Sequence, residues 1–434
     1  MTAPMDNRSE GLGMYDLVAQ LFPICRSITG DGVRRTLEII KAHIPLETYE
    51  VPTGTKAFDW TVPKEWNIRD AYVLDPRGEK VIDFQRNNLH VLGYSTPVDK
   101  TVTLAELQEH LHSLPEQSNA IPYVTSYYEE RWGFCVADLV RNTLSDGEYR
   151  VVIDSELQEG HLTYGELVIP GSSSQEVLLS TYVCHPSMAN NELSGPAVAT
   201  WLAKWIAGAP RRYTYRLVFI PETIGSIVYL SRNLNHLKEH VIAGFNVTCV
   251  GDDRAYSFLP SRNGGTLADR VALNVLQDTH PEFKAYSFLE RGSDERQYCS
   301  PGVDLPVVSV MRSKYGCYPE YHTSLDNLEL VSPQGLQGAF NVLRDCLEVI
   351  ERNDIYRTTC LGEPQLGRRG LYPTLSTRTS YNSVRTIMDV LAYADGSNDL
   401  LDVSERIGAP VLSLLPVIDT LVDSGLLSGV ETED

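Results

Sequence analysis

The feature that most constrains the fold is the alternation of short apolar runs with helical segments between about residues 130 and 350. The runs are rich in Val, Leu and Ile and lie at 150–153, 166–169, 177–182, 216–220, 244–250 and 305–310. A segment rich in Ala and other apolar residues, 194–207, separates two of them and predicts a helix. Strands that are apolar throughout and alternate with helices belong to buried α/β sheets. We therefore predict an α/β fold with a mixed sheet flanked by helices, built from residues 1–48 and 129–365.

Residues before about 130 show two different sequence patterns. Residues 11–43 predict helices, because Leu17, Leu21 and Leu37 recur at helical spacing. From 49 to 128, by contrast, short β-like runs such as those at 70–74 and 89–94 are separated by Pro, Gly and Asp. We interpret 49–128 as a small β-rich domain inserted into the larger fold.

The last part of the chain, 366–434, predicts a winged helix-turn-helix. A helix at 384–393 is followed by a second helical stretch, a turn at Gly408 and a third helix that ends near Ser424. Residues 371–434 hold three arginines against ten acidic residues. A DNA-binding module needs the opposite sign of charge, so we expect this domain to make protein contacts or to support a homo-oligomer.

Composition excludes several classes of function. The formal net charge of −20 repels phosphate backbones and anionic lipids, so we expect neither a nucleic acid nor a membrane partner. No apolar stretch reaches the roughly 18 residues of a transmembrane helix, and the first thirty residues lack the pattern of a secretory signal. The eight cysteines are scattered without a CxxC pair, so we predict reduced thiols and a cytoplasmic protein.

Polar clusters follow the predicted strands, where ligands bind in open α/β sheets. His185 opens one loop, which also holds Asn191 and Glu192, while Glu222 follows the run at 216–220. Asp252 and His322 occupy two further loops. Zinc takes imidazole nitrogen and carboxylate oxygen, and a glutamate that is not a ligand can deprotonate its bound water. Each residue alone also fits a structural role as a loop or helix-capping residue, and the zinc prediction rests on the combination.

The order of these groups resembles the zinc-dependent aminopeptidases, a family that also includes glutaminyl cyclase. The resemblance covers roughly residues 130–350 and the helix before the insert, and its most specific element is the Tyr-His-Thr-Ser-Leu-Asp segment at 321–326. The whole chain is similar to a narrower group, the aminopeptidase-like proteins with a β insert and a C-terminal winged helix that occur in polysaccharide-biosynthesis contexts.

The resemblance implies a role for each matching residue. His185 would be the first metal ligand with Asp252 as its partner on the same zinc, His322 would serve the second metal position, and Glu222 would be the general base. Two positions depart from the pattern: the family's bridging aspartate falls on Asn191, and a second ligand glutamate falls on Thr223. Amides and hydroxyls are poor zinc ligands. We therefore favour one zinc held by His185, His322 and a carboxylate, with Glu192 as the alternative source of that carboxylate.

Three further residues are candidates for substrate binding. Arg26 is able to hold a substrate carboxylate or to bond carbonyls at a helix end. Asp294 would contact a substrate amine or lie solvated in its loop, and Tyr321 would line a pocket or simply pack. We reject a nucleophilic pair of Cys184 and His185, because adjacent residues on a strand point to opposite faces.

These observations lead to a predicted function. The first hypothesis is a zinc hydrolase that cleaves an amide bond in a small peptide or an aminoacyl conjugate. The departures at Asn191 and Thr223 favour an alternative, a deacylase or cyclase that acts on a sugar or natural-product intermediate. A third hypothesis is a binding protein that has lost catalysis, and the absence of any bound metal would support it.

Overall fold

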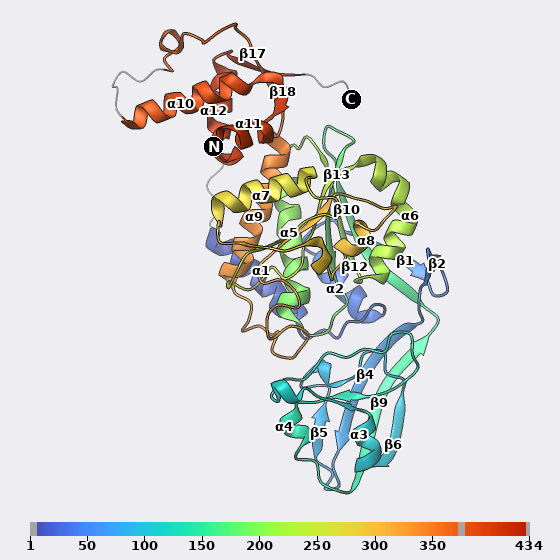
Figure 1. Cartoon of the computed structure of the whole chain (residues 1–434). Coiled ribbons are helices and arrows are strands. Elements are labelled where there is room, and N and C mark those ends of the chain that lie inside the picture. Colours follow the sequence, from blue (N-terminus) through green and yellow to red (C-terminus); the bar gives the residue numbers. More distant parts are fainter. Residues whose placement is uncertain (1–6, 372–377, 431–434) are drawn as a thin grey trace. The chain divides into compact units, whose positions relative to one another are not determined.

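The structure is a computed structural model that describes residues 7–371 and 378–430. It separates into two compact units, which we describe individually. The first comprises Met1–Ala268 with Lys284–Phe340, and the second comprises Asp269–Phe283 with Asn341–Asp434. Figure 1 shows the elements of both units.

An eight-stranded mixed sheet forms the centre of the first unit, which confirms the predicted α/β fold. Its strands follow the order β1-β10-β12-β11-β13-β16-β14-β15. Neighbouring strands in the centre of the sheet, from β12 to β16, run parallel. In spatial order, the strands are β1 (Glu47–Pro52), β10 (His161–Ile169), β12 (Thr214–Ile220), β11 (Glu176–Tyr182), β13 (Val241–Asn246), β16 (Val307–Met311), β14 (Ser257–Leu259) and β15 (Lys284–Ala285).

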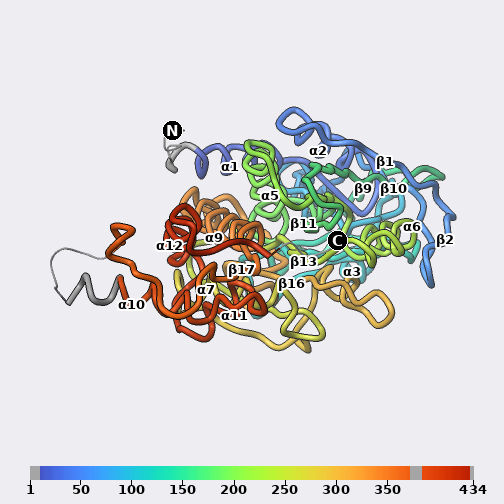
Figure 2. The backbone as a smooth tube through the Cα atoms, turned by 90° about the horizontal axis from the view of Figure 1, so that it is seen from above, coloured from blue at the N-terminus to red at the C-terminus, as the bar shows by residue number. Residues whose placement is uncertain are grey.

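Helices cover both faces of this sheet. The chain leaves β11 through α5 (Ser194–Ala207) to reach β12, then crosses back through α6 (Ile224–His240) to β13 on the other side of β11. Because such crossovers are right-handed, the reversal of direction places α5 and α6 on opposite faces (Figures 1 and 2). Helix α1 (Asn7–Leu21) packs on α5, and α2 (Asp31–Lys41) packs on β10.

One glycine makes the approach of α5 to the sheet possible. A Cβ atom on Gly195 would lie 2.3 Å from the carbonyl oxygen of Val247 and 2.4 Å from Oγ1 of Thr181. Any larger residue would therefore push the first turn of α5 away from the strand ends. The close contact places the loop before α5 directly over the carboxyl end of β11.

The inserted domain contains a four-stranded antiparallel sheet with the order β5-β4-β9-β6. Its strands are β4 (Glu65–Leu74), β5 (Lys80–Asp83), β6 (Val98–Thr103) and β9 (Glu148–Gln158). The predicted strand at 150–153 lies in β9, so its assignment to the main sheet was wrong. The predicted strand at 89–94 is also wrong, because this segment forms a short 3-10 helix, η1 (Asn88–His90), followed by isolated bridges.

Shorter elements complete the insert and its surroundings. They are β2 (Lys56–Ala57), β3 (Trp60–Thr61), α3 (Leu104–Glu109), β7 (Leu111–His112), η2 (Pro115–Gln117), β8 (Phe134–Cys135) and α4 (Asp138–Arg141). A buried carboxylate ties the insert to the main sheet: Oε2 of Glu65, at the start of β4, accepts hydrogen bonds from Nη1 of Arg34 at 3.1 Å and the backbone N–H of His161 at 3.0 Å. Helix α2, β4 and β10 therefore meet at one side chain.

The second unit contains the winged helix-turn-helix. Its helices are α10 (Arg378–Tyr393), α11 (Leu400–Ile407) and α12 (Val411–Asp423), and its sheet has the order β18-β17-β19, with β18 (Asp395–Asp399), β17 (Ile355–Thr358) and β19 (Leu427–Gly429). The central strand, β17, precedes residue 366, so the module starts earlier than the predicted boundary. The unit also includes most of α7 (Leu267–Thr279) and the end of α9 (Pro333–Arg352).

Arg270 joins α7 to the winged helix within this unit. Its guanidinium lies 3.2 Å from Asp399, 2.8 Å from Asp402 and 3.0 Å from Glu405. Asn274, one turn later on α7, donates to Oγ of Ser404 and accepts from the N–H of Val411.

Among the residues that the structure describes, no helix is both long and apolar enough to cross a membrane.

Candidate active site

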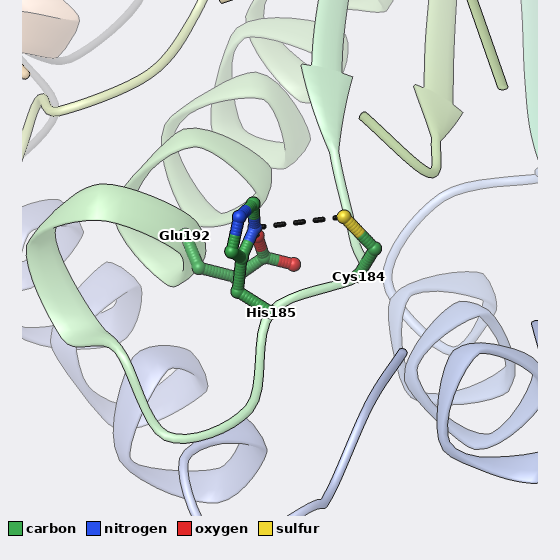
Figure 3. A group of neighbouring side chains, drawn as sticks. All are labelled: Cys184, His185 and Glu192. Atoms are coloured by element: carbon green, nitrogen blue, oxygen red, sulfur yellow. Dashed lines mark hydrogen bonds and ion pairs between the residues drawn. The ribbon is translucent and has the colours of Figure 1, made fainter. Parts of the chain in front are cut away.

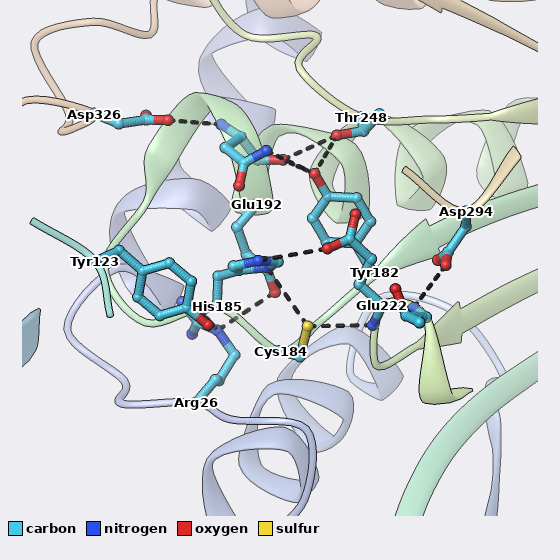
Figure 4. Close-up of polar contacts among 12 residues, drawn as sticks. Arg26, Tyr123, Tyr182, Cys184, His185, Glu192, Glu222, Thr248, Asp294 and Asp326 are labelled. Carbon is cyan, nitrogen blue, oxygen red and sulfur yellow. Dashed lines mark hydrogen bonds and ion pairs between the residues drawn. The ribbon is translucent and has the colours of Figure 1, made fainter. Parts of the chain in front are cut away.

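Three candidate residues converge at the carboxyl edge of the parallel strands. His185 follows β11, Glu222 follows β12, and His322 lies in the long loop between β16 and α9. These strands are close neighbours in the sheet, so residues distant in sequence meet at one edge, as expected for an open α/β sheet. Figure 4 shows how His185 and Glu222 face one another across this edge.

Both nitrogen atoms of His185 face acidic side chains. Nδ1 lies 2.7 Å from Oε2 of Glu192, while Nε2 lies 3.6 Å from Oε2 of Glu222 (Figures 3 and 4). Burial opposes the charged form of this imidazole, but the Glu192 carboxylate bonded to Nδ1 favours it and raises the pKa of His185 well above 6.5. A carboxylate on Nδ1 fixes the ring and leaves Nε2 to face the site.

Cys184 contacts His185, which corrects the geometric argument against that pair. Its Sγ atom lies 3.5 Å from Nδ1 of His185 (Figure 3), because β11 ends at Tyr182 and the strand alternation no longer applies. Burial raises the pKa of the Cys184 thiol to about 12, and Sγ accepts a hydrogen bond from the N–H of Glu222. The thiol is therefore protonated and is a poor nucleophile.

His322 lies beside His185 with its ring held from one side by Tyr321. The two imidazole centroids are 5.4 Å apart, and the Tyr321 ring stacks on His322 at 3.9 Å. Burial and the neighbouring His185 lower the pKa of His322 to about 3, so its imidazole is neutral. Its Nε2 atom is buried and has no hydrogen-bond partner among the described residues. A neutral imidazole with an unused nitrogen is the form that binds metal ions.

Asn191 presents a second unused buried atom. It lies in a short π-helical turn, η3 (Ala189–Leu193), where its backbone N–H donates to Oδ2 of Asp326 at 3.0 Å. Its Nδ2 donates to the hydroxyl of Tyr182 at 2.7 Å, while Oδ1 has no partner within the described residues. The amide is thereby oriented with its nitrogen toward Tyr182, and the oxygen is left without a donor.

Glu192 and Arg26 contact His185 at Nδ1 and at its carbonyl oxygen. The Glu192 carboxylate bonds Nδ1 of His185, and its other oxygen lies 3.8 Å from Nε of Arg26. Arg26 is 1% exposed and donates to the carbonyl oxygens of His185 and Leu21. Of the two roles predicted for Arg26, the structure shows the second: it is buried and bonds a carbonyl at the end of α1, and it also orients His185 and Glu192.

Asp294 occupies a comparable supporting position next to Glu222. Its Oδ1 accepts hydrogen bonds from the N–H of Thr223 and the hydroxyl of Ser226, both at 2.8 Å (Figure 4 shows the first). It is completely buried, and burial together with the nearby Glu222 raises its pKa to about 8. Thr223 has a φ of 64°, so Asp294 fixes a strained turn. This burial corrects the predicted contact of Asp294 with a substrate amine.

The Glu222 side chain is only partly exposed. Its burial raises the pKa of its carboxyl group. A raised pKa suits a group that must accept and release a proton near neutral pH.

The Asp252 carboxylate already has four hydrogen-bond donors. It accepts from the N–H groups of Arg254 and Ser313, the Ser313 hydroxyl and Nδ2 of Asn190. Its predicted role as the zinc partner of His185 therefore stays a prediction that no contact supports.

Three donors at this edge are of the kinds that a metal ion can bind. Nε2 of His185, the unpartnered Nε2 of His322 and the unpartnered Oδ1 of Asn191 are buried nitrogen and oxygen donors at one edge of the sheet. Within the described chain, Cys184, His185 and Glu192 also form a group whose ligand atoms lie within 4.8 Å of one another. We read that trio as hydrogen-bonded, because its carboxylate bonds Nδ1 and its thiol is protonated.

Sequence reasoning missed Tyr123, which belongs to the inserted domain. Its ring centroid lies 5.2 Å from that of His185 and 5.2 Å from that of His322. Figure 4 shows the ring beside His185. Nothing in the local pattern of 121–128 marked these residues, apart from three tyrosines in one short segment. The insert therefore supplies one wall of the site.

Comparisons with known proteins agree with this architecture. A family model described as a domain of unknown function, DUF4910, matches residues 15–353, and a winged helix-turn-helix model matches 354–429. The chain is 47% identical over 428 residues, 98% of both sequences, to a Clostridium acetobutylicum protein named as a polysaccharide biosynthesis protein with an aminopeptidase-like domain.

Solved structures extend the comparison. A crystal structure of a protein from Clostridium acetobutylicum, named as a peptidase, matches with a TM-score of 0.93, 46% identity and coverage of 98% of each chain. A zinc aminopeptidase from Bacillus subtilis shares the fold at 11% identity, with a TM-score of 0.56 over 78% of this chain and 94% of that chain. The chain thus belongs to the DUF4910 family and has an aminopeptidase-like fold followed by a winged helix-turn-helix.

Proposed function

We propose that this protein is a zinc-dependent hydrolase that cleaves an amide bond in a small peptide or an aminoacyl conjugate. The observation that supports it best is the convergence of two imidazole nitrogens and the Glu222 carboxylate at the carboxyl edge of the sheet. His185 and His322 would hold the metal, with Oδ1 of Asn191 as a third donor. The fold shared with zinc aminopeptidases is consistent with this proposal.

Glu222 is the residue placed to move protons. Its carboxylate lies on the Nε2 side of His185 and its pKa is raised, so it is suited to take a proton from the attacking water and to return it to the leaving amine. When bound, zinc supplies Lewis acidity and lowers the pKa of a coordinated water. Glu192 and Arg26 keep the imidazole of His185 in one orientation throughout.

A second function is favoured by two specific residues. Asn191 and Thr223 stand where carboxylate ligands are expected in zinc aminopeptidases, and the Clostridium relative is named for polysaccharide biosynthesis. Both observations support deacylation or cyclisation of a sugar-linked intermediate on the same metal site. Parallel assays with aminoacyl anilides and with N-acylated amino sugars distinguish the two functions, since each substrate class reports on one of them.

The test of the proposed function starts with elemental analysis of the purified protein. We expect about one zinc per chain in the wild type and its loss in H185A and H322A. H236A, which removes a surface histidine on α6, should retain it. E222Q should keep the metal and lose activity by about 10²–10⁴-fold. A wild type that takes up no metal even when zinc is supplied would contradict the hydrolase and favour a binding protein.

The winged helix calls for a separate proposal. Because its charge is strongly negative, we propose that it contacts protein, including a second copy of this chain, and not DNA. Sedimentation velocity of the full chain, with and without duplex DNA, tests this. Binding of the duplex at physiological salt would overturn the proposal.

A further inference from the structure

The inserted domain reaches the candidate site through residues 121–123. The backbone N–H of Tyr123 donates to the carbonyl oxygen of His322 at 2.9 Å, and the N–H of Ser324 donates to the carbonyl of Ile121 at 2.9 Å. The N–H of Ile121 also donates to Oγ of Ser324 at 3.0 Å, so the two segments pair like short antiparallel strands around the Pro122–Thr323 bridge. The His322 loop is therefore hydrogen-bonded to the insert on both sides of Thr323, at His322 and at Ser324.

His322 needs such support, because its backbone is strained. Its φ of 56° lies in the left-handed region, which residues with a Cβ atom rarely adopt unless their surroundings hold them there. The paired insert segment accounts for that restraint: the His322 carbonyl is fixed by Tyr123, and the following residues are fixed by Ile121. The strained backbone in turn sets the direction of the imidazole.

Tyr123 also contacts the two imidazole rings directly. It meets His322 edge to face, with an interplanar angle of 86°, and tilts at 60° to His185. Its hydroxyl bonds the hydroxyl of Tyr127 at 2.7 Å, and the Tyr127 ring packs edge-on against Tyr94 in the core of the insert. A continuous chain of contacts thus runs from the insert core to both histidines.

We propose that residues 121–123 hold His322 in its metal-binding orientation, with Tyr123 as a positioning residue, so that the insert completes the metal site. This inference rests on the zinc site of the proposed function. Removal of the Tyr123 ring leaves the ligands and the backbone bonds of 121–123 in place, but it takes away the packing against both imidazoles, opens a gap beside them and so loosens the His322 loop. Loss of groups that orient metal ligands weakens metal affinity by about 10–100-fold.

The experiment uses the full chain and two readouts. Amide hydrogen exchange of the loop at 318–326 is measured without metal, and zinc affinity is measured by competition with a chromophoric chelator. In Y123A we expect loop exchange to rise about tenfold and the zinc Kd to weaken by about 10–100-fold, with a changed visible spectrum for bound Co²⁺. Y123F keeps the ring and should remain close to wild type in both readouts.

Controls separate positioning from general destabilisation. Y128A removes an exposed ring from the same segment and should change neither readout. S324A removes the acceptor for the Ile121 N–H without touching either histidine, and it serves as the test variant if Y123A does not fold. Unchanged loop exchange, or unchanged zinc affinity despite faster exchange, would overturn the inference. If the wild type binds no zinc, the proposed function fails, while the metal-free loop exchange still decides whether 121–123 hold His322.

Discussion

The Nδ1 atom of His185 lies 2.7 Å from Oε2 of Glu192, and the imidazole is thereby turned with Nε2 toward Glu222. Glu192 is therefore placed to act on the site through His185. We expect E192Q to bind zinc about 10–100-fold more weakly than the wild type, because the amide keeps the shape but loses the charge that makes His185 a better ligand. A competition titration measures this affinity.

The control for E192Q is E176Q, which changes a buried glutamate at the opposite end of β11. That variant should lose stability without a change in zinc affinity, because Glu176 pairs with Arg216 and His236 away from the site. Equal zinc affinities for E192Q and the wild type would show that the bond to Nδ1 does not tune the ligand.

Asn191 offers a prediction in the opposite direction. Its Oδ1 is buried without a hydrogen-bond partner, and a carboxylate oxygen is a stronger zinc ligand than an amide oxygen. We expect N191D to tighten zinc binding by about tenfold or more. N190D is the matched control, because Asn190 donates to Asp252 and its carboxylate would repel that group without approaching the metal. Equally tight binding by N190D would argue against Asn191 as a ligand.

Arg26 is predicted to be essential for stability. Its guanidinium is buried beside Glu192, and R26M would leave that carboxylate without its cationic neighbour. Breaking a buried pair from one side costs about 3–5 kcal/mol, which urea denaturation of the full chain should detect. R35A removes an exposed arginine from α2. This variant should change the free energy of unfolding by less than about 0.5 kcal/mol. Similar stabilities for the two variants would contradict the buttressing role.

The contact of Arg34 with Glu65 predicts how stability depends on pH. Burial opposes ionisation of Glu65, but hydrogen bonds from Arg34, His161 and Asn67 prevail and lower its pKa to about 2. A carboxyl group with a lowered pKa stabilises the folded state fully above its unfolded pKa of about 4.5, and this contribution is lost as the pH falls toward 2. Thermal unfolding should show E65Q destabilised at pH 7, with the difference from wild type shrinking by pH 3.

Glu79 provides the comparison for Glu65, because its side chain is 68% exposed on the same domain. E79Q should resemble the wild type at both pH values, since exposed ion pairs contribute little to stability. A constant difference between E65Q and wild type from pH 7 to pH 3 would show that ionisation of Glu65 is not what joins α2 to β4.

The sequence was sufficient to predict the elements whose signals are local. Helix α5 spans 194–207 as predicted, because a dense run of Ala and other apolar residues has few alternatives in a buried layer. The strand at 150–153 was assigned to the wrong sheet, since alternation of apolar residues identifies a strand but not its partners. Register and sheet membership depend on contacts between distant residues, which periodicity does not record.

The same limit explains the outcome at the site. His185, Glu222 and His322 were found because each follows a recognisable strand or motif, and the sheet brings their positions together. Tyr123 was missed because it reaches the histidines from another domain. Asp294 was misjudged because charged side chains in loops are usually solvated, and only the folded structure shows this one to be buried.

The ion pairs of Arg270 have a consequence for how this architecture was assembled. The two family models divide the chain between residues 353 and 354, yet Arg270 on α7 lies on the far side of that line from Asp399, Asp402 and Glu405. A gene fusion at the apparent boundary would leave three carboxylates and a guanidinium without their partners. The winged helix is therefore matched in charge to a helix that lies before the boundary between the two family models.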